Sequence, residues 1–129
     1  MPMLEAIRTD ALPAGLPFPA AIRAGNLVFV SGQIGNVTGE MKLIDGGLEA
    51  EARQALEHLR TALEAAGSSQ DRVVKCTVFF ADMRDFQPFN AVYREFFGDH
   101  LPARSGVEVK GLALGARVEI ECIALRGDD

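Results

Sequence analysis

Two segments of the chain carry apolar side chains at the spacing of an amphipathic helix. In the first, six apolar residues recur every three or four positions, and a glycine stop follows directly: Leu48, Ala52, Leu56, Leu59, Leu63, Ala66 and then Gly67. A second helix is predicted from Asp85, a typical N-cap residue, to Gly98, with Pro88 tolerated in its first turn. Its aromatic residues share one side, which we interpret as core: Phe86, Phe89, Tyr93, Phe96 and Phe97.

Four other segments are rich in β-branched and apolar residues and are predicted to be strands: residues 26–34, 72–80, 104–109 and 116–125. The segment 12–19 holds three prolines and a glycine, which predicts an ordered loop or an extended lead-in. The order strands, helix, strand, helix, strands predicts an α+β fold in which two helices cover one face of a mostly antiparallel sheet.

The last predicted strand alternates between an apolar side and a mixed side. Val118, Ile120, Cys122 and Ala124 form the apolar side, which we expect beneath the helices, and Glu119 and Glu121 lie on the other. In the preceding strand, Ser105, Val107 and Val109 match the helix-packed side. This match predicts that Arg104, Gly106 and Glu108 share the open face with Glu119, at a register that alternation leaves undetermined.

The open face mixes acids with Ile123 and Leu125, so a monomer would expose apolar surface there. A homo-oligomer of cyclic symmetry that packs this face inward is one interpretation. The other is a solvated face with an incidental ion pair, and alternation alone favours that second interpretation.

Composition narrows the classes of function. The 129 residues suit a single domain over 1–129, and the net charge of −5 without a basic run argues against nucleic acid as a partner. No apolar run is long enough to span a membrane, and no signal peptide is recognisable, so we expect a cytoplasmic protein. Cys76 and Cys122 are expected to be buried free thiols, and His58 and His100 lack ligand spacing, so no metal site is predicted.

Several motifs, in order along the chain, resemble those of the RidA family (reactive intermediate deaminase A, also called YjgF). "PARSGVEV" (102–109) followed by "ARVEIECIAL" (116–125) is similar to its C-terminal signature. "FVSGQI" (29–34), the helix at 51–67 and the segment 73–98 resemble its other characteristic stretches. The likeness therefore covers most of the chain.

The resemblance implies a chorismate-mutase-like α+β fold, assembled as a homotrimeric barrel with active sites between subunits. It implies hydrolysis of reactive 2-imino acids to 2-keto acids and ammonia, without a metal or an organic cofactor. Arg104 would bind the substrate carboxylate, and Glu119 would hold or activate the attacking water. Residues expected to line the pocket are Phe18, Ser31, Gly32, Asn90 and Gly106.

Two positions depart from the family pattern. Phe18 stands where a tyrosine is common, and Gly106 where a cysteine or serine is common, which predicts a roomier and less polar pocket. Alternatives therefore stay open: a deaminase of a larger enamine, such as an aminomuconate or an intermediate of nucleobase catabolism, or a non-catalytic module that binds small ligands. The endoribonuclease label that some relatives carry is the least favoured, because of the acidic charge. Arg104 could also form only a rim salt bridge to Glu108 or Glu119.

Overall fold

A computed structural model describes residues 3–127. Within them, six strands form a sheet in the order β1-β2-β3-β6-β4-β5. The strands are β1 (Leu4–Ile7), β2 (Ala21–Ala24), β3 (Leu27–Gln33), β4 (Val73–Phe80), β5 (Ala103–Glu108) and β6 (Val118–Leu125). Neighbouring strands are antiparallel except β4 and β5, which are parallel. The predicted α+β fold with a mostly antiparallel sheet is confirmed.

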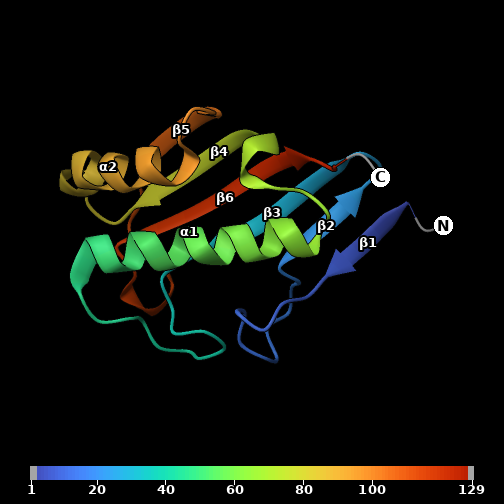
Figure 1. The fold of residues 1–129 in the computed structure, drawn as a ribbon. Helices are drawn as coiled ribbons and strands as arrows, with labels where there is room; N and C mark the ends of the chain where they lie inside the picture. Colours follow the sequence, from blue (N-terminus) through green and yellow to red (C-terminus); the bar gives the residue numbers. More distant parts are fainter. Residues whose placement is uncertain (1–2, 128–129) are drawn as a thin grey trace.

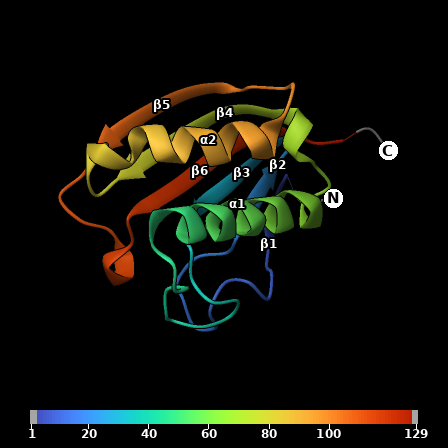
Figure 2. The same cartoon turned by 60° about the vertical axis from the view of Figure 1, so that its left-hand side comes forward.

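Two α-helices, α1 (Gly47–Ala65) and α2 (Phe86–Phe97), lie side by side on one face of this sheet (Figures 1 and 2). Both agree with the predicted helices to within one residue. Gly98 ends α2 with a φ of 64°, a left-handed conformation that glycine adopts without steric cost. The opposite face of the sheet carries no helix from the described part of the chain (Figure 2).

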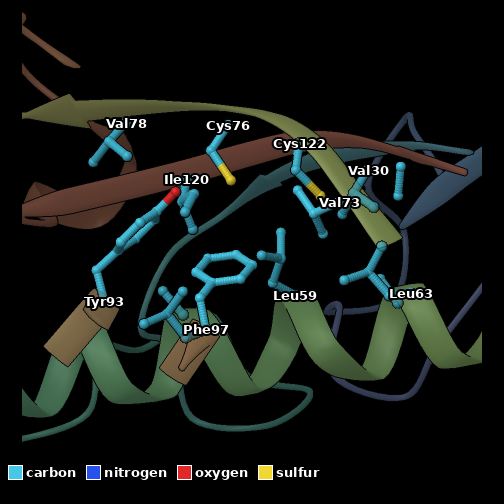
Figure 3. Close-up of a cluster of buried hydrophobic side chains, with 14 of the residues drawn as sticks. Val30, Leu59, Leu63, Val73, Cys76, Val78, Tyr93, Phe97, Ile120 and Cys122 are labelled. Atoms are coloured by element: carbon cyan, nitrogen blue, oxygen red, sulfur yellow. The ribbon is translucent and has the colours of Figure 1, made fainter. Parts of the chain in front are cut away.

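The hydrophobic core lies between the helices and the sheet. Leu59 and Leu63 of α1 and Phe97 of α2 pack toward β4 and β6 (Figure 3). Cys76 and Cys122 face the same core from neighbouring strands as buried free thiols, as the sequence predicted. The predicted aromatic core stripe is confirmed for Phe89, Tyr93 and Phe97, whereas Phe86 and Phe96 are only partly buried.

Strands β1 and β2 were missed by the sequence interpretation. Each has only four residues, "LEAI" and "AIRA", which are poor in the β-branched and aromatic residues that mark strands. Their place in the sheet comes from pairing with β3 rather than from local preference.

A polar cluster, in which Glu51 and Asp85 are buried and Arg117 is exposed, fixes the start of β6 against both helices. Arg117, directly before β6, donates two hydrogen bonds to the Asp85 carboxylate at 2.8 and 3.1 Å. The Arg117 backbone N–H donates to Oε1 of the buried Glu51 in α1 at 2.8 Å. Asp85 occupies the predicted N-cap position of α2 but forms no capping hydrogen bond with its side chain. The cluster therefore fixes the position of Glu119 along the sheet, because Glu119 follows Arg117 by two residues in the chain.

Candidate active site

Two hollows gather the residues that the sequence singled out. The first, which we call the α2–β5 hollow, has a volume of about 350 Å³. It is lined by Phe86, Asn90, Tyr93, Arg94, Leu101, Pro102, Arg104 and Gly106. The second, the β3–β6 hollow, has a volume of about 220 Å³ and contains Phe18, Gly32 and Glu119.

Arg104 projects from β5 onto a surface of aromatic rings. Its guanidinium carbon lies 4.6 Å from the centre of the Tyr93 ring and 5.3 Å from those of Phe86 and Phe89. Such cation–π contacts stabilise a cation without neutralising it. Burial lowers the pKa of Arg104 below its usual value, although a guanidinium stays charged in proteins.

The Arg104 guanidinium has no carboxylate partner among residues 3–127. Its Nη2 atom is buried without a hydrogen-bond partner, and the same is true of the Asn90 Oδ1 atom in the same hollow. The predicted alternative, a rim salt bridge from Arg104 to Glu108 or Glu119, does not form within residues 3–127. Glu108 instead accepts a hydrogen bond from the Met83 backbone N–H at 2.8 Å, and Glu119 lies in the other hollow. A half-buried guanidinium with an unpaired donor has the chemistry to bind an anion such as a carboxylate.

Glu119 lies against the backbone of Gly32 in the β3–β6 hollow. A Cβ atom added at Gly32 would come within 2.8 Å of the Glu119 Cδ atom, so any side chain there would displace the carboxylate. Glu119 is half-buried, and burial raises the pKa of its carboxyl group, with a smaller contribution in the same direction from Glu121. A carboxylate of raised pKa in a hollow is suited to accept a proton.

Arg104 and Glu119 lie on opposite faces of the sheet, so the predicted common face is wrong. The register pairs Arg104 with Cys76, and Cys76 with Cys122, and residues paired in this way point to the same side. Glu119 pairs with Phe79 on the other side. The prediction failed because β5 is an edge strand: Val107, placed by its apolar character under the helices, is 44% exposed on the open face.

The same correction applies to the neighbours of Arg104. Gly106 and Glu108 are in register with Val78 and Phe80 and lie on the helix side, whereas Ser105 lies on the open face. The hydrogen bond that the Lys75 ammonium donates to Ser105 Oγ at 3.2 Å agrees with this placement.

The remaining predicted pocket residues divide between the two hollows, except Ser31, which lines neither. Phe18 and Gly32 accompany Glu119, while Asn90 and Gly106 accompany Arg104. The Ser31 hydroxyl donates to the Pro19 carbonyl at 2.8 Å, so it satisfies loop backbone.

The sequence interpretation missed the surroundings of both charged groups. Phe86 and Tyr93 were assigned to the core, yet their rings also form cation–π contacts with the Arg104 guanidinium. Their spacing along α2 could have indicated this only once β5 was known to lie beside α2. The apolar wall around Glu119 comes largely from loops that carry no periodic pattern: Leu12, Leu16, Met41 and Leu114.

The fold and these hollows define an α+β protein with an unpaired guanidinium nitrogen in one hollow and a half-buried carboxyl group in the other. Comparison with known proteins is more specific: the sequence profile of the endoribonuclease L-PSP family matches residues 8–126. The chain belongs to this family, which is the RidA (YjgF) family that the motifs predicted.

Similar proteins cover nearly the whole chain. The 2-iminobutanoate/2-iminopropanoate deaminase of Mus musculus is 41% identical over 124 residues, which are 95% of this chain and 92% of that protein. Protein HMF1 of Saccharomyces cerevisiae is 44% identical over 92% of each chain. The crystal structure of E. coli TdcF with bound serine has a TM-score of 0.86 and 37% identity, covering 95% of this chain and 99% of that one.

No helix within residues 3–127 combines the length and the apolar character that a membrane span requires. In the same part of the chain, no three His, Cys, Asp or Glu side chains gather as a group that could hold a metal ion.

Proposed function

We propose that this protein hydrolyses reactive 2-imino acids to 2-keto acids and ammonia. The observation that carries the proposal is Arg104, a half-buried guanidinium that packs on three aromatic rings and has no carboxylate partner within residues 3–127. The deaminase names of the mammalian relatives support the same reaction. TdcF holds serine, a 2-amino acid in which, as in a 2-imino acid, the carbon that bears nitrogen is bonded to a carboxylate.

Arg104 binds the substrate carboxylate in this proposal. A guanidinium presents two parallel N–H donors that match the two oxygens of a carboxylate, and the rings beneath it restrict its orientation. Binding a carboxylate would give the buried Nη2 atom a partner. The imine carbon, bonded to that carboxylate, is then fixed in position.

Glu119 holds the attacking water. As the water oxygen bonds to the imine carbon, a water proton passes to the Glu119 carboxylate and the C=N π electrons move to nitrogen. Glu119 returns this proton to the nitrogen, which gives the carbinolamine. Transfer of the hydroxyl proton to the amino group, again through Glu119, then breaks the C–N bond, releases ammonia and leaves the 2-keto acid. Imine hydrolysis is intrinsically easy, so orientation and one proton acceptor are sufficient.

The complete site requires two copies of the chain in this proposal. Within one chain the carboxylate-binding group and the proton acceptor lie on opposite sheet faces, and neither hollow contains both. The open face also exposes large apolar side chains: Leu27, Phe29, Val107 and Leu125. In this proposal, a homotrimer buries this surface and brings Arg104 of one subunit to Glu119 of the next. The family resemblance implied active sites between subunits.

Direct assay tests the reaction. An amino-acid oxidase generates 2-imino acids in situ, and keto-acid formation is followed with semicarbazide as the trap, in parallel with buffer alone. We expect the protein to accelerate hydrolysis above the buffer rate. If a panel of imines shows no acceleration but 2-keto acids still bind by calorimetry, the non-catalytic binding module replaces this proposal.

Gly32 provides a test of where Glu119 must lie. Gly32→Ala is expected to lower kcat/KM by about tenfold to a hundredfold, because the added methyl group displaces the carboxylate that positions the water. Circular dichroism and thermal unfolding check that the fold remains. Gly111→Ala is the matched control, since a Cβ at Gly111 meets no atom within 4 Å. Equal activity of the two variants would contradict the assigned position of Glu119.

A further inference from the structure

No polar contact within residues 3–127 fixes the guanidinium of Arg104. The side chain forms no ion pair and no hydrogen bond there, and its Nη2 atom is buried without a partner. Asn90 in the same hollow does not supply a partner, since its Oδ1 atom is also buried and unpaired. An arginine side chain has several rotatable bonds, so the apolar groups around it must determine how the guanidinium is oriented.

Three rings of α2 contact the guanidinium. Phe86, Phe89 and Tyr93 stand at positions i, i+3 and i+7 of the helix, which places them on one side of it. The Arg104 guanidinium carbon lies 4.6 Å from the centre of the Tyr93 ring, against 5.3 Å for each of the other two. Tyr93 is therefore the closest of the three contacts.

The Tyr93 ring is itself held in place by the core. It is 5% exposed and packs against Phe89 and Phe97, whose ring centres lie 5.7 and 4.7 Å away. Figure 3 shows the ring extending from α2 toward the sheet. Because close packing restricts its motion, it offers the guanidinium one stable face, whereas Phe86 is only partly buried.

The hydroxyl group of Tyr93 does not account for this contact. Tyr93 is the only tyrosine of the chain, yet its hydroxyl oxygen is buried without a hydrogen-bond partner within residues 3–127. Burial raises the pKa of Tyr93, so the phenol stays neutral and is no ion-pair partner for Arg104. A phenylalanine would present the same ring face without an unpaired hydroxyl. The contact with Arg104 therefore depends on the ring.

We infer that Tyr93 is a positioning residue for Arg104, because its ring holds the guanidinium in an orientation that can receive a carboxylate. The side-chain freedom that binding would otherwise remove is then already restricted in the unbound protein. Tyr93 should therefore determine the affinity for the carboxylate and leave the rate of the chemical step nearly unaffected. This inference rests on the proposed role of Arg104 in substrate binding.

Calorimetry with 2-oxobutanoate and steady-state kinetics with oxidase-generated 2-iminobutanoate test this role. Tyr93→Leu should raise the Kd of the keto acid and the KM of the imine by about tenfold, because the nearest ring is lost. The kcat should change by less than about twofold. Tyr93→Phe keeps the ring and should restore most of the affinity that Tyr93→Leu loses. If Tyr93→Leu does not fold, Tyr93→Met, which fills the core without a ring, decides the question.

Phe96→Leu is the matched control. Phe96 lies on the same helix and forms a cation–π contact with a different arginine, Arg60, at 4.8 Å. It lines a groove between α1 and α2 and is absent from the α2–β5 hollow. Its replacement should lower the unfolding temperature, as the loss of the Tyr93 ring does. The Kd and KM of Phe96→Leu should nevertheless stay within about twofold of those of the unmodified protein.

The outcomes separate this inference from the proposed function. If the unmodified protein neither binds 2-oxobutanoate nor accelerates hydrolysis, the role of Arg104 itself is overturned. Unchanged affinity in Tyr93→Leu, or an equal loss in Phe96→Leu, overturns the positioning role and leaves carboxylate binding by Arg104 in place. A loss confined to kcat, or a Tyr93→Phe variant that binds as weakly as Tyr93→Leu, also overturns it.

Discussion

Arg104→Lys is expected to lower kcat/KM for 2-imino acids by about a hundredfold or more, because lysine cannot form the two parallel hydrogen bonds to a carboxylate. A lysine ammonium would also lose the fit of the flat guanidinium on the Tyr93, Phe86 and Phe89 rings. Steady-state kinetics measures the loss, and calorimetry with a 2-keto acid should show that binding is lost with it.

The same position predicts an unusual result for stability. A half-buried cation without an opposite charge among residues 3–127 costs folding free energy, so Arg104→Leu should unfold at the same temperature as the unmodified protein or higher. Arg94→Lys is the control, because Arg94 lines the same hollow but is exposed. The kcat/KM of this variant should differ from that of the unmodified protein by less than about threefold. A clear fall in unfolding temperature for Arg104→Leu, or full activity of Arg104→Lys, would contradict a binding role.

The helices and the long strands could be predicted because their periodicity is local. The apolar stripe from Leu48 to Leu63 and the alternation from Val118 to Ala124 each record one buried side, and the structure places both as expected. The short strands β1 and β2 could not be predicted in this way, since pairing with β3 defines them.

The sheet face of Arg104 could not be predicted because alternation gives two sides without saying which is buried. In β6 the difference is clear, since one side is wholly apolar. In β5 the two sides carry Arg104 and Gly106 against Ser105 and Val107, and neither is fully buried. Only the parallel register with β4, where Arg104 pairs with Cys76, decides the face. That pairing depends on where α2 returns the chain, which no local pattern records.

Glu119→Gln is expected to lower kcat by about a hundredfold to ten-thousandfold, the range over which a positioned general base contributes. Glutamine preserves shape and can hold a water, but it cannot accept the proton. The dependence of activity on pH is a second test of the role of Glu119. Because burial and Glu121 raise the pKa of Glu119, activity should fall with decreasing pH at values above the ordinary glutamate pKa of 4.5.

Two controls separate catalysis from structure at Glu119. Glu121→Gln removes the smaller contribution to that raised pKa, so the acidic limb should move to lower pH while the maximum rate remains. A carboxyl group whose pKa is higher in the folded state stabilises the protein only below its unfolded pKa, and this stabilisation is lost as pH rises through the folded pKa. Glu119→Gln, which stays neutral, should therefore unfold at a higher temperature than the unmodified protein at pH 7, with the difference shrinking on acidification.

Mixing the two inactive variants tests whether one site draws on two chains. Arg104→Lys subunits retain Glu119, and Glu119→Gln subunits retain Arg104, so an interface between the two kinds in the correct order restores a complete site. In trimers reassembled at random from equal amounts, about one interface in four is complete, which predicts about a quarter of the original activity. The two groups lie on opposite faces of one sheet within a chain. If both nevertheless acted from the same chain, only a chain with both residues unmodified would be active, and the mixture would stay inactive. Mixed trimers that stay inactive, after mass spectrometry has established that subunits exchanged, would contradict the shared site.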